Sequence, residues 1–572
     1  MRYQFYLASS LEKVFPDRAP TPMKKETRLS VWRGTRAAVQ LVYRAEDEEG
    51  FVPLQEFEVL VEGAPCDTEF RKVELIPSDF PCYGMKDEDY IKTEPGLFPD
   101  LLKPTKNRVR PITNQYRSLW LSWDLPANVK PGEYKIRIIA KAEEERLLPN
   151  NVIFKDERVK GLAFEESFIL DVKEAILPKQ SLIHTEWFHV DSLADYYHVD
   201  VFSERHWEII ENYIKAAGEH YGINMLLTPV FTPPLDTKAG GERLTVQLVD
   251  VKVVDGRYTF DFSKLKRWTR LCKTYGIEYL EISHLFTQWG ATSAPKIVAE
   301  VNGKEQKIFG WETKASGAEY QAFLQAFLPE LRKELEVLGY DEKHVYFHIS
   351  DEPSKEQMEN YYAAREVVKG LIPEEQIIDA MSSLEFYKMG LLKHPIPGTS
   401  EVDEFYEAGV PDLWVYYCCG QCVDVPNRFF AMQSARNRIM GVLMYLHGIK
   451  GFLHWGYNFY YTQYAIEPVN PYEMTHAGYA FPSGDAFLVY PGKDGRPLDS
   501  IRSEVQVEAL TDLRALQYLE SLTSKNFVED LIYEDLKERP MTFRSYPKDG
   551  NWILNLREKV AEEIAKRSEK NE

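Results

Sequence analysis

The sequence predicts a multidomain fold of the β and α/β classes, with an N-terminal antiparallel β-sandwich, a (β/α)8 TIM-like barrel and a small C-terminal appendage. Three observations support this prediction. The chain has 572 residues, too many for one small hydrophobic core. Its first part alternates apolar and polar residues in short segments separated by Pro and Gly turns. After Pro178, short apolar segments alternate with long amphipathic ones, which is typical of a parallel α/β domain.

The predicted domains are residues 1–175 for the sandwich, 176–475 for the barrel and 476–572 for a C-terminal cap of strand and helix. The clearest sandwich strands are expected at residues 37–45, 57–63, 119–126 and 134–142. The barrel strands are expected at residues 181–188, 223–231, 277–286, 344–350, 377–383, 412–419 and 451–458. Seven strands approach a closed barrel of eight. A doubly wound open sheet is the alternative, but no G-x-G-x-x-G turn follows the first strand to favour it.

One barrel helix is especially clear from its spacing. Apolar residues recur every three or four positions between the third and fourth strands, which predicts an amphipathic helix whose apolar face covers the barrel. These residues are Tyr320, Phe323, Leu324, Phe327, Leu328, Leu331, Leu335 and Leu338.

The composition excludes some function classes. A formal net charge of -20 would repel phosphate backbones, so no nucleic-acid partner is expected. No apolar run is long enough for a signal peptide or a membrane span, which favours a cytoplasmic location. The 34 Tyr, 30 Phe and 11 Trp residues suit a sugar-binding protein, although large β-rich domains also contain many aromatic residues.

The six cysteines do not follow the spacing of a disulfide framework, which favours a reducing compartment. Cys418, Cys419 and Cys422 lie close together and could bind a metal. A zinc site would need a second Cys or His pair at matching spacing, and none is evident. The sequence therefore predicts no metal.

The segment from His344 to Ser354 contains the candidate catalytic residues Asp351 and Glu352. Because strand side chains alternate, Tyr346, His348, Ser350 and Glu352 should point into the barrel. Pro353 should hold Glu352 extended, and a capping box of Ser354 and Gln357 should start the next helix. The two acids would then lie at the carboxyl end of the strand, which is the active-site face of such barrels.

Two adjacent carboxylates resist ionising together, so the pKa of one should rise toward the range of a general acid. A role in capping a helix or pairing with Arg is the alternative for any strand-end acid. Candidate substrate-binding residues lie near the ends of this and the neighbouring strands, where Trp and Tyr walls around carboxylates would form a sugar pocket. They are Trp187, His284, Trp289, His348, Tyr416, Trp455, Tyr457 and Asn458.

Several motifs resemble glycoside hydrolase family 123 and the related domain-of-unknown-function 4091 proteins. The most specific are HISDEP at residues 348–353 and GFLHWGYN at residues 451–458. Weaker matches are GLFPDLL at residues 96–102, PGEY at residues 131–134, Gly484-Asp485, and YPG ahead of SIRSE.

The resemblance implies a β-N-acetylgalactosaminidase that releases terminal β-linked N-acetylgalactosamine from a glycan with retention, without metal or cofactor and without a covalent enzyme intermediate. The substrate's own 2-acetamido oxygen would attack the anomeric carbon. Asp351 would orient the acetamido group, and Glu352 would act as acid and then as base. The two acids of a conventional retaining enzyme usually lie on different strands, on either side of the sugar. Two acids adjacent in the sequence fit the substrate-assisted mechanism better.

Three other hypotheses remain open. Glu281 or Glu186 could be the nucleophile of a conventional retaining glycosidase acting on a 2-hydroxy sugar. A metal-dependent amidohydrolase could use His184, His284, His348 and His454, although the first strand lacks a His-x-His pair. Finally, the chain could bind carbohydrate without cleaving it.

Overall fold

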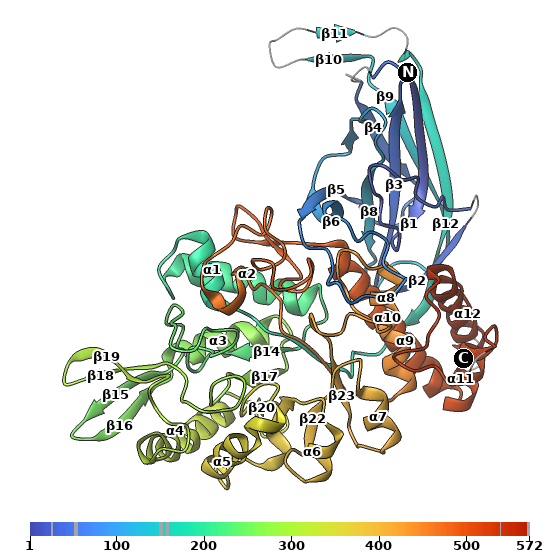
Figure 1. Ribbon diagram of the computed structural model, residues 1–572. Helices are drawn as coiled ribbons and strands as arrows, with labels where there is room; N and C mark the ends of the chain where they lie inside the picture. Colours follow the sequence, from blue (N-terminus) through green and yellow to red (C-terminus); the bar gives the residue numbers. More distant parts are fainter. Residues whose placement is uncertain (25–26, 51–54, 148–152, 156–158, 538, 569–572) are drawn as a thin grey trace.

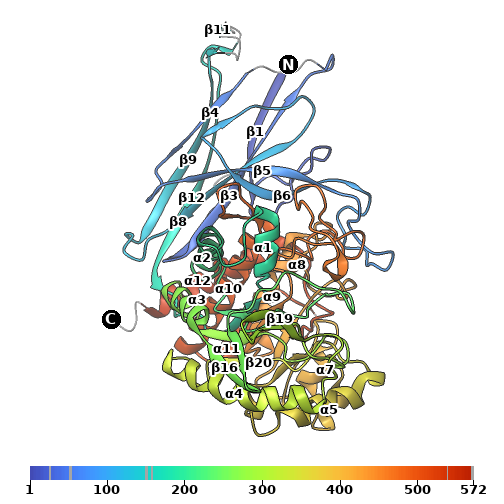
Figure 2. The same cartoon turned by 90° about the vertical axis from the view of Figure 1, so that its left-hand side faces the viewer.

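The protein consists of N-terminal antiparallel sheets followed by an α/β domain, as the computed structural model shows in Figure 1. The structure describes residues 1–24, 27–50, 55–147, 153–155, 159–537 and 539–568. In Figures 1 and 2 the blue and cyan strands of the N-terminal sheets form one end of the molecule, and the α/β domain forms the other.

The N-terminal region contains two five-stranded sheets. The first has the order β1 (Arg2–Ser9), β3 (Arg36–Glu46), β8 (Arg117–Asp124), β5 (Glu69–Ser78) and β6 (Gly96–Pro104), with every pair antiparallel. The second has the order β2 (Arg28–Arg33), β12 (Ala163–Ile176), β9 (Gly132–Ala142), β4 (Phe57–Glu62) and β7 (Arg108–Val109), and only its β2–β12 pair is parallel. A short pair, β10 (Glu145–Leu147) and β11 (Ile153–Lys155), lies apart.

The two sheets share one hydrophobic core. Phe5 and Leu41 of the first sheet pack in the same buried cluster as Val59, Ile138 and Leu170 of the second. Alternating side chains therefore place one apolar face of each sheet against the other, as a sandwich requires. The strand segments predicted in this region are confirmed.

The α/β domain is built on a six-stranded parallel sheet. Its order is β20 (Val345–Phe347), β17 (Tyr279–Ile282), β14 (Met225–Thr228), β13 (Ile183–Glu186), β24 (Gly451–His454) and β23 (Trp414–Tyr416). The connecting helices are α1 (Val190–Tyr197), α2 (Glu204–Glu219), α3 (Ser263–Thr274), α4 (Ala318–Val337), α5 (Met358–Val368), α6 (Leu384–Lys388), α7 (Val402–Glu407), α8 (Ser434–Arg438) and α9 (Met440–Leu446).

A separate parallel pair, β21 (Ile378–Ala380) and β22 (His394–Ile396), lies beside this sheet. Single parallel bridges connect Phe347 to Ile377 and Gly398 to Tyr416. Strand β22 was not predicted, because it is only three residues long and contains Pro395. Since the continuous sheet has six strands, the closed (β/α)8 barrel stays a prediction.

Side chains alternate along β20 as predicted. Val345, Phe347 and Ile349 belong to the buried cluster that contains the apolar face of α4. Tyr346 instead packs with residues from the other face of the sheet. The helix α4 also confirms the sequence pattern, because the first seven of its eight predicted apolar residues are buried.

Two insertions, one between β14 and α3 and one between β17 and α4, together form a small four-stranded sheet that the sequence did not predict. Its strands are β15 (Asp250–Val254), β16 (Arg257–Asp261), β18 (Ile297–Val301) and β19 (Lys304–Phe309). In Figure 1 it projects from the α/β domain on the side away from the sandwich.

The C-terminal region is mainly helical. It contains α10 (Ile501–Leu522), α11 (Lys525–Tyr533) and α12 (Gly550–Ser568), preceded by two-residue strands β25 (Tyr490–Pro491) and β26 (Pro497–Leu498). None of the described helices is both long and apolar enough to cross a membrane.

Helix α10 joins the two regions through buried ion pairs. Arg502 donates to both carboxylate oxygens of Asp100 on β6, at 2.9 Å each, and both side chains are buried. Glu504 accepts from Arg36 at 2.5 Å and from Arg71 at 2.7 Å, which lie on β3 and β5. The position of α10 is therefore fixed by charges of the sandwich.

Replacing Arg502 with Ala should lower the thermal unfolding midpoint strongly. The change leaves the Asp100 carboxylate buried without its cation, which costs about 3–5 kcal/mol for a pair of this kind. Arg496→Ala is the matched control, because its pair with Asp494 is exposed and separated by 3.8 Å. Equal midpoints for the two variants in a calorimetric scan would contradict the assigned role of Arg502.

Candidate active site

Asp351 follows β20 at the carboxyl end of the parallel sheet and is buried. Gln288 Nε2 donates to its Oδ2 at 2.7 Å. The backbone N–H of Trp289 donates to the Asp351 carbonyl at 3.3 Å. The loop after β17 therefore holds both the carboxylate and the backbone of Asp351.

Glu352 has a left-handed backbone conformation, with φ of 42°. The expectation of an extended Glu352 was wrong. Its N–H donates to the Ala380 carbonyl at 3.2 Å, and this contact ties the strained residue to β21. The residue is exposed as a whole, but its Oε1 accepts a hydrogen bond from the Tyr416 hydroxyl of β23. The two adjacent acids thus have different surroundings.

Both carboxyl groups have raised pKa values. Burial raises the pKa of Asp351 well above its usual range, and the neighbouring charge of Glu352 adds to the effect. Loss of hydration also raises the pKa of Glu352, with smaller contributions from Asp485 and Glu401, while the hydrogen bond from Tyr416 opposes the rise. For Asp351, the effect of Glu352 agrees with the prediction that one carboxylate of the pair would raise the pKa of the other.

His348 lies between two buried carboxylates. Its Nε2 is 2.5 Å from Glu281 Oε1, and its Nδ1 is 3.0 Å from Asp379 Oδ1. Burial alone would lower the pKa of His348, but these two hydrogen bonds outweigh it and raise the pKa to about 10. Both ring nitrogens of His348 are occupied, so neither is free for the substrate contact that the sequence predicts.

Glu281 accepts hydrogen bonds from three side chains of the site. Besides His348, it accepts hydrogen bonds from Trp187 Nε1 at 2.8 Å and from the Thr185 hydroxyl. The edge of the Trp187 ring meets His284, at 5.1 Å between ring centres. Trp187 and His284 are therefore brought together with His348 as predicted.

His284 is buried, and neither of its ring nitrogens has a hydrogen-bond partner among the described residues. Burial lowers its pKa well below the usual range, and the charge of His348 lowers it further. The neutral ring offers one donor and one acceptor, which suits contact with a ligand hydroxyl.

His284, His348 and Asp379 form a group that could offer three metal ligands. However, the two imidazole rings are stacked, with centres 4.2 Å apart and planes inclined by 9°. Imidazole lone pairs lie in the ring plane, so stacked rings do not direct them toward one ion. His348 also uses both nitrogens for Glu281 and Asp379. This geometry does not favour a metal centre.

The three neighbouring cysteines do not converge on a metal either, because Cys418 Sγ donates to Gln421 Oε1 at 3.3 Å. All six cysteines lie among the described residues, and each is a free thiol.

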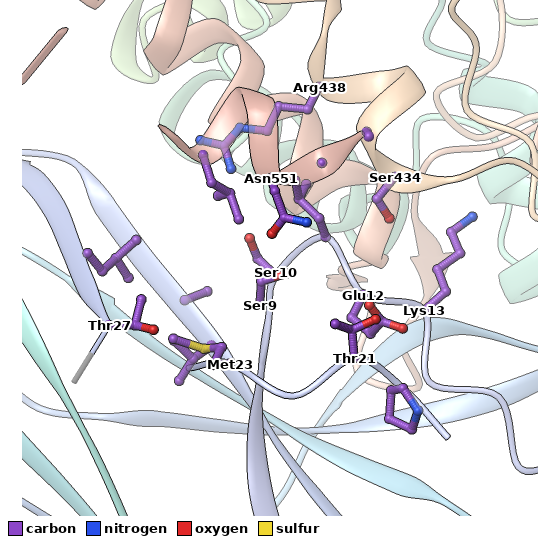
Figure 3. Close-up of a pocket in the computed structure, with 18 of the residues that line it drawn as sticks. Ser9, Ser10, Glu12, Lys13, Thr21, Met23, Thr27, Ser434, Arg438 and Asn551 are labelled. Carbon is purple, nitrogen blue, oxygen red and sulfur yellow. The ribbon is translucent and has the colours of Figure 1, made fainter. Parts of the chain in front are cut away.

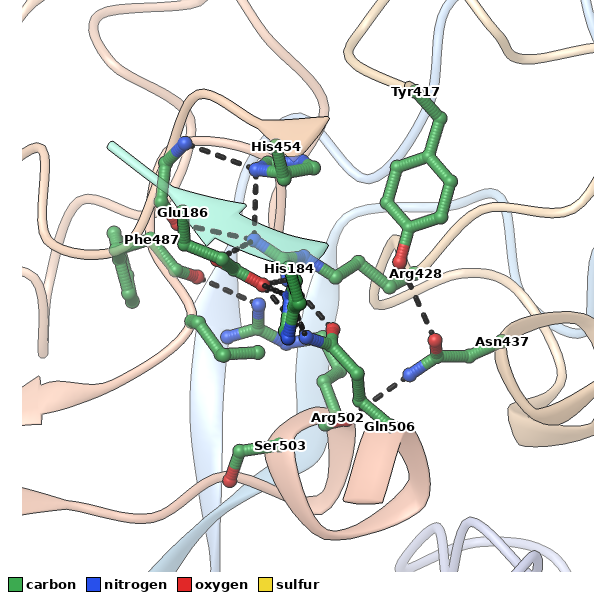
Figure 4. A network of polar contacts seen from close by, with 12 residues as sticks. His184, Glu186, Tyr417, Arg428, Asn437, His454, Phe487, Arg502, Ser503 and Gln506 are labelled. Atoms are coloured by element: carbon green, nitrogen blue, oxygen red, sulfur yellow. Dashed lines mark hydrogen bonds and ion pairs between the residues drawn. The ribbon is translucent and has the colours of Figure 1, made fainter. Parts of the chain in front are cut away.

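Glu186, at the end of β13, is part of a second buried network, shown in Figure 4. Arg428 donates to both of its carboxylate oxygens, at 2.6 and 2.9 Å, and Gln506 of α10 donates at 2.7 Å. Burial would raise the pKa of Glu186, but the charge of Arg428 together with the hydrogen bonds from His184 and Arg428 outweighs it and lowers the pKa. His184 and His454 contact the same network.

Three of the predicted aromatic residues are linked to the acid pair by hydrogen bonds, directly or through Asp485. Trp289 is partly exposed and has a φ of 54°. Tyr416 contacts Glu352, as described above. Trp455 donates from Nε1 to Asp485 Oδ2 at 3.0 Å. Asp485 in turn contributes to the raised pKa of Glu352.

Tyr457 and Asn458 are not brought to the acid pair. Tyr457 is fully buried among the helices, and its hydroxyl donates to the Tyr213 carbonyl at 3.0 Å. Asn458 binds the backbone N–H and carbonyl of His189, at 2.9 and 3.0 Å. Their positions indicate structural roles, which corrects the interpretation of both residues as substrate contacts.

Sequence reasoning missed three residues of the site. Gln288 contacts Asp351, Asp379 contacts His348, and Asp485 contacts Trp455. Two of them had a detectable signal: Asp379 is the charged residue of a predicted strand, and Asp485 belongs to the Gly484-Asp485 motif. Gln288 is a loop residue without one.

Family models match most of the chain. The glycoside hydrolase 123 catalytic domain matches residues 187–519, and the glycoside hydrolase 123 N-terminal domain matches residues 10–142. The chain belongs to glycoside hydrolase family 123. It is therefore a glycoside hydrolase, and its substrate is a glycan. A comparison with curated proteins finds no match.

Solved structures agree with this family assignment. A family 123 glycoside hydrolase from Clostridium perfringens, described in connection with glycolipid glycan hydrolysis, has a TM-score of 0.69 at 16% identity. The match covers 99% of this chain and 97% of that one, and at this identity it shows the fold alone. A glycosyl hydrolase family 2 member from Bacteroides cellulosilyticus has a TM-score of 0.26 at 11% identity. The match covers 79% of this chain and 46% of that one, and a likeness this low indicates neither fold nor function.

Asp379→Asn should lower the pKa of His348 from about 10, because one of the two carboxylates that stabilise the imidazolium loses its charge. Titration of ring-labelled histidines by NMR measures this change. Asp341→Asn, which alters an exposed acid, should leave the His348 signal unchanged. A His348 signal unaffected by Asp379→Asn would contradict the description of the ion pair.

Proposed function

We propose that this glycoside hydrolase is a retaining exo-β-N-acetylgalactosaminidase that uses the 2-acetamido group of its substrate as the nucleophile. The observation that carries the proposal is the contrast among the carboxylates at this end of the sheet. Asp351 and Glu352 have raised pKa values and lie together at the end of β20, whereas the other two candidate acids are engaged within the protein.

A conventional retaining mechanism needs a free carboxylate as the nucleophile, about 5–5.5 Å from the acid. Glu281 is fully buried and already accepts from His348, Trp187 and Thr185. Glu186 forms a bidentate ion pair with Arg428, and its lowered pKa makes it a weak nucleophile. These contacts argue against a nucleophilic role for either residue.

The proposed reaction begins with the acid pair sharing one proton. With substrate bound, Glu352 is protonated and Asp351 is ionised, because the acetamido N–H joins the hydrogen bond from Gln288 and the positive charge of His348 in offsetting the burial that raises the pKa of Asp351. The acetamido N–H donates to Asp351, and its carbonyl oxygen attacks the anomeric carbon. The glycosidic bond breaks as Glu352 gives its proton to the leaving oxygen.

In the second step, Glu352 accepts a proton from water. The resulting hydroxide adds to the anomeric carbon, the bond to the acetamido oxygen breaks, and the carboxyl group of Glu352 is restored. Two displacements at one carbon retain its configuration. Trp289, Trp455 and His284 are the proposed sugar contacts, since they offer aromatic faces and one unpartnered imidazole close to the acids.

We also infer that the parallel strands close into a barrel of eight. One buried cluster contains side chains from every strand of the sheet and of the β21–β22 pair, which is expected if these side chains fill a barrel interior. They are Ile183, Met225, Leu227, Tyr279, Tyr346, Ile378, Ala380, Ile396, Trp414, Tyr416 and Leu453. The single bridges from Phe347 to Ile377 and from Gly398 to Tyr416 support the closure.

The decisive comparison is turnover of aryl β-N-acetylgalactosaminide and aryl β-galactoside by the wild type, Asp351→Asn and Glu352→Gln, with a chelator present. Only the acetamido sugar should be cleaved, and each variant should lose about 10²-fold or more in kcat, since general acid catalysis alone contributes that much. The Glu352→Gln loss should shrink for aryl leaving groups of low pKa, which need little protonation.

Other outcomes would favour different functions. Cleavage of the galactoside at a similar rate would favour an enzymic nucleophile. Loss of turnover with chelator would favour a metal-dependent hydrolase. Asp341→Asn and Glu356→Gln serve as controls, because both change exposed acids of the same segment.

Tyr416→Phe should move the alkaline limb of the kcat/KM profile to higher pH. The Tyr416 hydrogen bond stabilises ionised Glu352, so its loss raises the pKa of Glu352 further, and the acid stays protonated to higher pH. Tyr417→Phe is the matched control, because its hydroxyl contacts Asn437 instead. A limb that stays in place or moves to lower pH in Tyr416→Phe would contradict this role.

A further inference from the structure

A cavity of about 680 Å³ lies between the N-terminal sandwich and the C-terminal helices. Figure 3 shows it bounded by Ser9, Ser10 and Glu12 on one side and by Ser434, Arg438 and Asn551 on the other. The first group comes from the end of β1 and the residues just after it, and the second comes from α8 and the start of α12. No proposed catalytic or sugar-contacting residue lines it. The volume falls within the range of about 300–1,000 Å³ for small-molecule sites.

Most of the charged groups that line the cavity already have partners. Arg438 donates to Glu508 and Asp512, both at 2.8 Å, and Ser10 donates to Glu508 at 2.7 Å. Lys13 donates to two backbone carbonyls of the α/β domain. The cavity therefore offers few free charges to an ionic ligand.

Several of its free hydrogen-bonding groups are neutral. Ser434 is buried, and its Oγ has no partner among the described residues. The amide groups of Gln433 and Asn555 also line the cavity, and neither makes a side-chain hydrogen bond to another described residue. A buried hydroxyl without a partner is unfavourable unless a ligand or water satisfies it.

Apolar side chains complete the lining. Leu11, Leu29, Leu554 and Ala435 line the same cavity as the hydroxyl and amide groups. A surface of this kind matches a molecule that has both hydroxyl groups and C–H faces and carries no charge. A phosphate or carboxylate ligand would need unpaired cations instead.

We propose that this cavity is a second glycan-binding site, which takes a neutral saccharide of about disaccharide size. Ser434 and the amides of Gln433 and Asn555 bind its hydroxyls, and the leucines contact its C–H faces. Such a site would hold glycan against the sandwich while the active site acts elsewhere. It is independent of the reaction proposed above.

The test uses lactose and chitobiose as probes in calorimetric titrations of the full chain carrying Glu352→Gln, which slows turnover about 10²-fold or more. At least one probe should bind, and adding Asn555→Leu and Ser434→Val should weaken that binding about tenfold, the loss expected for one or two hydrogen bonds. Asn526→Leu, a change to an exposed asparagine of α11 outside the cavity, is the matched control. Asn555→Leu alone, at an exposed position, is used if the double variant does not fold.

Hydrogen exchange locates the bound probe. Protection of residues 9–13 and 550–558 by the saccharide supports the proposal. The proposal is overturned if neither probe binds, if the cavity variants bind as tightly as the Asn526→Leu control, or if protection is confined to the loops after β17 and β20. Hydrolysis by the cavity variants without Glu352→Gln should stay at the wild-type rate, which separates this result from any failure of the proposed reaction.

Discussion

The site depends on one constraint, which is that each charge buried at the carboxyl end of the parallel sheet needs a partner of opposite charge. His348 shows this most clearly, since it lies between Glu281 and Asp379 and keeps its proton for that reason. Glu186 and Arg428 satisfy one another in the same way. Removing one partner of such a pair leaves an uncompensated charge in the protein interior, which is costly.

This constraint also separates the acids into two groups. Three acids are engaged in ion pairs with His348 or Arg428 and stabilise the site: Glu281, Asp379 and Glu186. Asp351 and Glu352 have no cationic side chain in hydrogen-bond contact, because Asp351 has the neutral Gln288 and Glu352 the neutral Tyr416. Their pKa values rise as a result, and one proton can be shared between them. The positive φ of Glu352 sets its side chain apart from that of the buried Asp351.

Much of the fold was predictable because the period of the apolar residues changes after Pro178 and because β20 alternates strictly. Strand β22 was missed, since three residues with a proline give no periodic signal. The site was harder. Trp455 reaches it, whereas Tyr457 and Asn458 do not, because the chain leaves the sheet after His454 and turns into the helical core. The backbone of Glu352 and the contact between Gln288 and Asp351 depend on tertiary packing, which a single sequence does not encode locally.

The central claim is that Asp351 positions an acetamido group that acts as the nucleophile. Inhibition by a galacto-configured thiazoline, a stable mimic of the cyclised acetamido intermediate, tests it most directly in the wild type and in Asp351→Asn. The account predicts that the thiazoline binds at least about 10²-fold more tightly than N-acetylgalactosamine, as expected for an analogue of a reaction intermediate, and that Asp351→Asn removes most of this preference. Thiazoline binding no tighter than that of the parent sugar, or unchanged in Asp351→Asn, would contradict the account.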